Sequence, residues 1–159
     1  MRELKAEGLR VDGVGIQGHW GLDYPTTENL EAFITATAAL GVKVLVTEMD
    51  LDILPPAFRY EGADISLRAE MREELNPYAG GLPAGVERMQ TDRYVELFTI
   101  LLKHADAVGR VTFWGVYDKT SWLNDWPVKG RTSYPLLFGR DYQKKSVFYA
   151  VLAAAQKGP

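Results

Sequence analysis

Val42-Lys43-Val44-Leu45-Val46-Thr47 is the stretch of sequence that decides the fold. Four of its six residues are β-branched, and β-branched side chains favour extended strands. The run is nearly continuously apolar, which is typical of a strand covered on both faces, as in a parallel sheet. We therefore predict a buried parallel strand at residues 42–47.

Further predicted strands and helices alternate on both sides of this strand. The predicted strands cover 42–47, 110–114 and a short glycine-rich strand at 11–20 that runs into a polar, aromatic tip. The predicted helices cover 2–7, 26–40, about 94–105 and about 144–156. Strands that alternate with helices favour an α/β fold with parallel pairing and right-handed crossovers.

The connection between the second strand and the next long helix is unusually long, from residue 49 to residue 90. It contains Pro55-Pro56, Asn76-Pro77 and Gly80-Gly81, and one short charged helix is expected near 64–75. Connections of this length in compact domains are commonly functional loops.

Three strand–helix units could form a small open sheet, but the polar groups described below follow the carboxyl ends of the strands. That placement suits the mouth of a (β/α)8 TIM barrel, whose usual length is about 250 residues. Three units cannot close such a barrel. We therefore expect residues 1–159 to be one incomplete barrel domain.

Composition excludes several classes of protein. The chain has 159 residues, 47% of them hydrophobic, a net charge of −3, no cysteine and two histidines. The absence of cysteine excludes disulfides and thiolate chemistry. The mild acidity offers no basic face for nucleic acid, and no apolar run approaches the roughly 18 residues of a membrane span. Met1 opens a charged segment and not a signal peptide.

Two of the predicted strands end in polar pairs at i, i+2 spacing, Gln17 with His19 and Glu48 with Asp50. Side chains alternate along a strand, so the members of each pair point to the same side of the sheet. Each residue alone is more simply explained as a strand-end polar group that faces water. Two such pairs on adjacent strands favour a functional site.

The chemistry of these groups suggests a division of roles. Glu48 is suited to act as a nucleophilic carboxylate, kept ionised by a hydrogen bond from His19, and Asp50 would fix the other imidazole nitrogen. Gln17 would either hold a sugar hydroxyl or orient Glu48. The other histidine, His104, falls on a predicted helix, so we predict neither a metal site nor a cofactor.

Tryptophan is concentrated after the third strand, at Trp114, Trp122 and Trp126. Flat apolar rings beside carboxylates suit carbohydrate, because the C–H faces of a sugar pack on aromatic rings while its hydroxyls seek polar partners. Tryptophans that simply plug the end of a barrel are the alternative. Their number in so short a stretch favours a sugar cleft.

The motifs 12–19 (DGVGIQGH), 46–50 (VTEMD), 111–118 (VTFWGVYD), 121–123 (SWL) and 135–138 (PLLF) together resemble glycoside hydrolase family 10, the endo-β-1,4-xylanases. The resemblance covers essentially the whole chain. It implies the last three βα units of the barrel, strands six to eight, in a retaining enzyme that hydrolyses xylan. Glu48 then falls on the nucleophile and His19 and Asp50 on its supports. Gln17, Trp114 and Trp122 fall around the sugar beside the scissile bond.

One element of the family is missing from the chain. A retaining glycosidase needs a second carboxyl about 5–5.5 Å from the nucleophile as acid and base. The family's acid glutamate follows an asparagine on the fourth strand, and this chain has no Asn-Glu dipeptide. Asp50 and Asp118 are poor substitutes. We therefore expect the isolated chain to be nearly inactive.

An incomplete barrel also leaves strand edges open, and open edges invite pairing. The expected partners are xylan or xylo-oligosaccharides, together with either a complementary amino-terminal half of the barrel or a second copy of the chain. No nucleic acid or membrane partner is expected. The polymeric substrate implies a secreted protein. A non-catalytic carbohydrate-binding or interaction module, or a retaining β-glucanase, remain alternatives.

Overall fold

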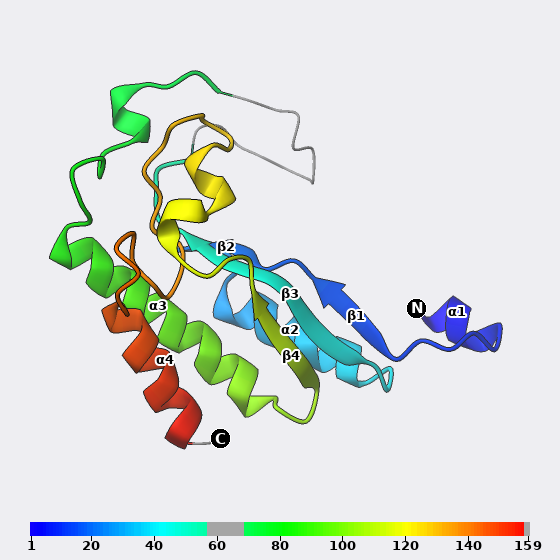
Figure 1. The fold of residues 1–159 in the computed structure, drawn as a ribbon. Helices are drawn as coiled ribbons and strands as arrows, with labels where there is room; N and C mark the ends of the chain where they lie inside the picture. Colours follow the sequence, from blue (N-terminus) through cyan, green and yellow to red (C-terminus); the bar gives the residue numbers. More distant parts are fainter. Residues whose placement is uncertain (57–68, 158–159) are drawn as a thin grey trace.

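The structure is a computed structural model that describes residues 1–56 and 69–157. In chain order its elements are α1 (Arg2–Ala6), β1 (Gly13–Ile16), β2 (His19–Gly21), α2 (Thr27–Ala38), β3 (Lys43–Asp52), η1 (Glu73–Leu75), α3 (Ala84–Lys103), β4 (Val108–Phe113), η2 (Asp118–Thr120), η3 (Trp122–Asn124) and α4 (Ser146–Lys157). The alternation of strands and helices in an α/β fold is confirmed (Figure 1).

All the paired strands are parallel, and β3 is the central one. β1 pairs with the first half of β3 and β2 with its second half, while β4 pairs with the opposite edge. The β1–β2 break does not interrupt the ladder. The carbonyl of Gln17 accepts a hydrogen bond from Glu48 N at 2.7 Å, and that of Gly18 accepts one from Asp50 N at 3.2 Å. β1 and β2 therefore act as one strand path.

Gly18 is required at this break. Its φ is +89°, and a Cβ built on it would lie 2.6 Å from Cγ1 of Val46. A side chain there would meet both an unfavourable backbone conformation and a steric clash. The glycine lets the path bend while it stays against β3, and it thereby brings His19 opposite Asp50 in the register.

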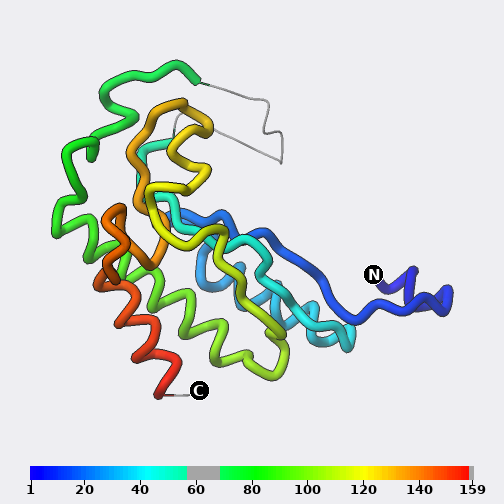
Figure 2. The backbone as a smooth tube through the Cα atoms, viewed as in Figure 1, coloured from blue at the N-terminus to red at the C-terminus, as the bar shows by residue number. Residues whose placement is uncertain are grey.

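The hydrophobic core lies on one face of the sheet. On β3, Val44 and Val46 are completely buried in a cluster with residues of α2, α3 and α4, whereas Leu45 and Thr47 are only half-buried. Since side chains alternate along a strand, the helices cover one face and leave the other partly open. A parallel sheet is normally covered on both faces. Figure 2 shows α2 and α3 beside the sheet and α4 packed along α3, while α1, which has no buried residue, stands apart from the sheet.

Several element boundaries differ from those predicted. β3 extends to Asp52, because β2 supplies pairing for its second half, and α3 begins at Ala84, which shortens the long connection. The charged helix expected near 64–75 falls partly outside the described residues. The part that is described contains only the short helix η1.

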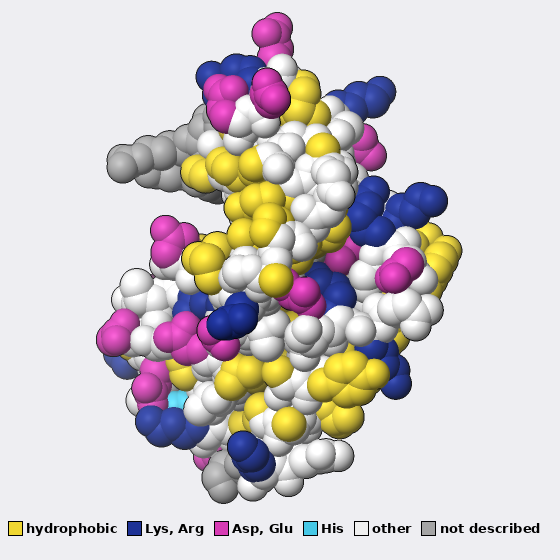
Figure 3. Space-filling view, turned by 90° about the vertical axis from the view of Figure 1, so that its left-hand side faces the viewer, with side chains coloured by type: hydrophobic (Ala, Val, Ile, Leu, Met, Phe, Trp, Pro, Cys, Tyr) yellow, Lys and Arg dark blue, Asp and Glu magenta, His cyan; other side chains and the backbone are white. Residues whose placement is uncertain are grey.

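The outer surface over α3 and α4 is mixed in character. Figure 3 shows small hydrophobic groups on this face, separated by charged and polar side chains. Tyr149 and Leu152 of α4 are among the exposed apolar residues. Among the described residues, no helix combines the length and the apolar character that crossing a membrane would need.

Candidate active site

A cavity of about 1110 Å³ opens at the carboxyl ends of the parallel strands. All six residues predicted for the site line it: Gln17, His19, Glu48, Asp50, Trp114 and Trp122. They come from the β1–β2 path, from β3 and from the segment after β4. The fold thus brings together residues that are up to 105 positions apart in the chain (17 to 122).

The imidazole of His19 lies between two carboxylates of β3. Its Nδ1 is 2.9 Å from Oδ1 of Asp50, and its Nε2 is 3.3 Å from Oε2 of Glu48. The parallel register places His19 directly opposite Asp50, and Glu48 precedes Asp50 by one full strand repeat. The i, i+2 spacing in the sequence therefore produces the contact that was expected from it.

These contacts favour a protonated imidazole. Burial opposes the charged form, but the hydrogen bond and charge of Asp50, and then those of Glu48, outweigh it and raise the pKa of His19. When the imidazole is protonated, both of its ring nitrogens carry hydrogens and can donate to these carboxylates. Such an imidazolium has no lone pair left for a metal ion.

Trp122 completes the surroundings of Asp50. Its indole Nε1 donates a hydrogen bond of 2.7 Å to Oδ2 of Asp50, and its ring lies 4.8 Å from that of His19. Trp126 stacks on the Trp122 ring at 4.8 Å with an interplanar angle of 23°. The Asp50 side chain, which is 1% exposed, is thus bonded through both oxygens.

Trp114 has a different environment. It follows β4, lines the cavity and is 47% exposed. A large aromatic face open to the cavity is suited to contact with a sugar ring. Trp122, by contrast, is anchored through its indole nitrogen to Asp50, so part of its role is within the protein.

The sequence analysis missed one carboxylate of the cavity. Asp52 lies at the end of β3 and lines the cavity with Glu48 and Asp50. Burial raises its pKa, against the charge of Arg131, whose guanidinium nitrogen lies 3.9 Å away. Continuing the i, i+2 series from 48 through 50 to 52 would have found it.

Asp118 does not belong to this cavity. Its side chain is completely buried and pairs with Lys145, the residue directly before α4, and it does not line the cavity. Asp118 is therefore not placed to donate a proton to a ligand held beside Glu48.

The cavity thus offers one accessible glutamate, Glu48, supported by the imidazole of His19. Such a carboxylate can act as a nucleophile or as a charge that stabilises a developing cation.

The Glycosyl hydrolase family 10 domain profile matches residues 1–154 of the chain. Endo-1,4-beta-xylanase A of Xylanibacter ruminicola is 44% identical over 152 residues, and a beta-1,4-xylanase of Dictyoglomus thermophilum is 40% identical over the same length. The match covers 96% of this chain and 41% and 39% of those proteins. The chain thus spans about two fifths of the length of these curated relatives.

A solved structure agrees with this assignment. A GH10 endoxylanase retrieved from a sugarcane soil metagenome superposes with a TM-score of 0.91 at 41% identity. The superposition covers 96% of this chain and 44% of that one. The family resemblance drawn from the motifs is therefore confirmed, and the chain belongs to glycosyl hydrolase family 10.

Proposed function

We propose that this chain is the carboxy-terminal portion of a retaining endo-β-1,4-xylanase. In this proposal the β1–β2 path, β3 and β4 are strands six, seven and eight of a (β/α)8 barrel. The observation that carries it is the position of the Glu48 carboxylate, 3.3 Å from the His19 imidazole in a cavity lined by tryptophans. The relatives named as xylanases support xylan as the substrate.

Glu48 would act as the nucleophile. Its carboxylate attacks the anomeric carbon of the xylose unit, the bond to the leaving xylose oxygen breaks, and a covalent glycosyl-enzyme forms. Water then attacks the same carbon, its proton passes to the conjugate base of the acid that protonated the leaving oxygen, and Glu48 is freed. The His19 imidazolium supports the carboxylate by donating a hydrogen bond, and Asp50 fixes the orientation of the ring.

The acid that protonates the leaving oxygen would come from outside these 159 residues. Asp50 is unsuited to this role, because it is buried and both its oxygens are engaged. Asp52 lies four residues along β3 from Glu48, roughly 13 Å at the strand rise of about 3.3 Å per residue. That is beyond the 5–5.5 Å or so needed for retention.

A complementary amino-terminal segment is the proposed source of the acid and the proposed partner of the open sheet. Within the described residues, the β1–β2 path and β4 each pair along one edge only. Leu45 and Thr47 are half-buried on the face that the helices leave open. Such a segment would pair with these edges and cover this face, and self-association is the alternative way to do so. A polymeric substrate also favours a secreted enzyme.

Complementation tests the proposal. The chain is mixed with a polypeptide that carries the unmatched amino-terminal part of the Xylanibacter ruminicola relative, and release of reducing ends from xylan and from cellulose is measured. We expect little release by the chain alone, release from xylan by the mixture, and loss of that release in Glu48→Gln. Glu74→Gln, at an exposed carboxylate, is the matched control.

A 2-deoxy-2-fluoro-xyloside with a good leaving group gives a second readout, because it traps the glycosyl-enzyme of a retaining enzyme. Peptide mass spectrometry of the mixture should find the label on Glu48. Label on another residue, or activity that survives Glu48→Gln, would refute the assignment. Sugar binding by the mixture without any turnover would favour a non-catalytic module.

A further inference from the structure

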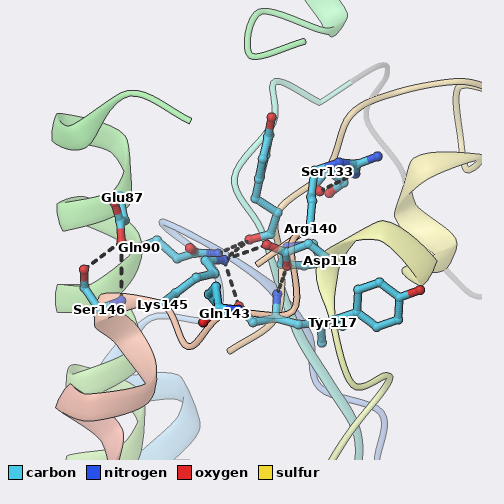
Figure 4. Close-up of polar contacts among 12 residues, drawn as sticks. Glu87, Gln90, Tyr117, Asp118, Ser133, Arg140, Gln143, Lys145 and Ser146 are labelled. Atoms are coloured by element: carbon cyan, nitrogen blue, oxygen red, sulfur yellow. Dashed lines mark hydrogen bonds and ion pairs between the residues drawn. The ribbon is translucent and has the colours of Figure 1, made fainter. Parts of the chain in front are cut away.

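A buried ion pair ties together the loop that carries the site tryptophans. We define the tryptophan loop as residues 118–136, which includes Trp122 and Trp126. Asp118 begins this loop, and Lys145 directly precedes α4. Oδ2 of Asp118 lies 3.1 Å from Nζ of Lys145, and their side chains are 0% and 10% exposed. Figure 4 shows this cluster between α3, the start of α4 and the loop.

Each partner of the pair also makes hydrogen bonds to the backbone at the carboxyl end of the tryptophan loop. Oδ1 of Asp118 accepts a hydrogen bond from Leu136 N at 2.8 Å. The ammonium of Lys145 donates to the carbonyls of Tyr134 and Leu136, both at 2.8 Å. The ammonium thus makes two hydrogen bonds to backbone carbonyls and an ion pair with Asp118. The pair therefore joins the two ends of the tryptophan loop.

Asn124 links the Asp118 end of the tryptophan loop to the turn that contains Trp122. Its amide nitrogen donates to the carbonyls of Asp118 and Ser121 at 2.9 and 2.8 Å, and its amide oxygen accepts from Ser133 N at 3.0 Å. Trp122 lies between Ser121 and Asn124 on η3. The base of the loop thus fixes the turn that presents the indole to Asp50.

Stability alone does not explain an ion pair at this place. Burial raises the pKa of Asp118 to about 6 and lowers that of Lys145, so both charges are costly here. Buried ion pairs are often no better for stability than apolar residues, and a more favourable role is to specify geometry. The other charged or titratable groups facing the pair are Arg140, Tyr94, Tyr134 and Glu87.

We propose that Asp118 and Lys145 are positioning residues, whose buried pair fixes the tryptophan loop so that the Trp122 indole stays on Asp50. The consequence for catalysis rests on the proposed function of the His19–Glu48–Asp50 group. The geometric consequence does not, because the Trp122–Asp50 bond exists without a sugar.

The test follows the indole protons of the chain by NMR after 15N labelling of tryptophan. The four tryptophans give four indole signals, and Trp122→Phe identifies the signal of residue 122. In Lys145→Met we expect the Trp122 indole proton to exchange with solvent about tenfold faster or more, as for loss of a hydrogen bond to a charged group. The proton of Trp20, which is in the core, should be unchanged.

Glu87→Gln is the matched control. Glu87 holds the start of α4 by accepting from Ser146 N and Oγ at 3.4 and 2.7 Å. Its change therefore loosens the same helix end and leaves every hydrogen bond of Asp118 and Lys145 in place, although it also removes a charge that acts on Lys145. It should leave Trp122 exchange unchanged. Unchanged exchange in a folded Lys145→Met, or an equal increase at Trp20, would overturn the proposal.

A pH series adds a readout that a purely structural role would not change. In the wild-type chain the Trp122 signal should shift with a midpoint near pH 6, where Asp118 takes up a proton. That step should be absent in Asp118→Asn, while the step that reports His19 remains. Persistence of the first step in Asp118→Asn would contradict the proposal.

Xylotriose affinity then tests the positioning role of Lys145 and the proposed function separately. If the chain binds this sugar, Lys145→Met should weaken binding in the wild-type background and have no further effect in Trp122→Phe. An additive effect in the double variant would overturn positioning through Trp122. If no variant binds xylotriose even in the mixture with the complementary amino-terminal polypeptide, the proposed function is contradicted, while the exchange rates still decide the positioning role.

Discussion

The indole nitrogen of Trp122 donates a 2.7 Å hydrogen bond to Asp50, which joins a loop residue to the central strand 72 positions earlier. Asp50 in turn holds His19, and His19 approaches Glu48. Glu48, the proposed nucleophile, is thus supported by a series of contacts that begins at Trp122 in the loop after β4.

Trp122→Phe should destabilise the chain by about 1.5–3 kcal/mol. The phenyl ring keeps much of the packing but cannot donate, so a buried oxygen of the charged Asp50 loses its partner. Urea unfolding monitored by circular dichroism measures the change. Trp114→Phe is the control, because Trp114 is 47% exposed, and its effect should stay within about 0.5 kcal/mol. Equal effects of the two substitutions would contradict the prediction.

Asp50→Asn should lower the pKa of His19 more than Glu48→Gln does. Burial lowers this pKa in all three proteins, while Asp50 contributes more than Glu48 to raising it and lies closer, at 2.9 Å against 3.3 Å. NMR titration of the imidazole Cε1 proton measures all three values. The reverse order, or a wild-type pKa below about 6.5, would be inconsistent with the structure.

His19 should make the stability of the chain depend on pH. Its folded pKa lies above the unfolded value, so its contribution is complete below about pH 6.5 and is lost as the pH rises through the folded pKa. Urea unfolding at several pH values should show this decline. In His19→Gln the decline should disappear, and an unchanged pH profile in that variant would assign it to another group.

Asp118 should also make the stability of the chain depend on pH, at lower pH than His19 does. Its pKa is raised by burial to about 6, so the folded chain binds this proton more tightly than the unfolded chain. The resulting stability is complete below about pH 4 and is lost as the pH rises to about 6. A difference of about two pKa units corresponds to roughly 2–3 kcal/mol. Unfolding of Asp118→Asn should lack this decline between pH 4 and 6, and its persistence would rule out Asp118 as the cause.

Gly18→Ala should destabilise the chain by about 2 kcal/mol or more. The left-handed backbone costs alanine about 1 kcal/mol, and the new Cβ would meet Val46 at 2.6 Å. Gly80→Ala, where a Cβ meets nothing within 4 Å, is the matched control for thermal unfolding. A Gly18→Ala protein as stable as the control would mean that the β1–β2 break can relax.

The sequence predicted the elements near the site well, because their signals are local. The β-branched run at 42–47 and the paired polar residues 17/19 and 48/50 follow from strand geometry, and all four polar side chains meet in the cavity. The length of β3 was underestimated, since its second half depends on pairing with β2.

Contacts between residues far apart in the chain could not be predicted from the sequence. Nothing in the spacing of residues 50 and 122 indicates that an indole would donate to that carboxylate. The burial of Asp118 against Lys145 likewise depends on how the loop returns to α4. Tryptophan content predicted an aromatic cleft but did not separate the open ring of Trp114 from the anchored ring of Trp122.

The order in which a ribosome releases the chain gives the Asp118–Lys145 contact a further significance. His19 and Glu48 leave the exit tunnel before Lys145, so a nascent chain can form the His19–Glu48 contact before the Asp118–Lys145 pair exists. A polypeptide truncated before Lys145 would therefore keep Glu48 and His19 but lack the ion pair that joins the two ends of the tryptophan loop.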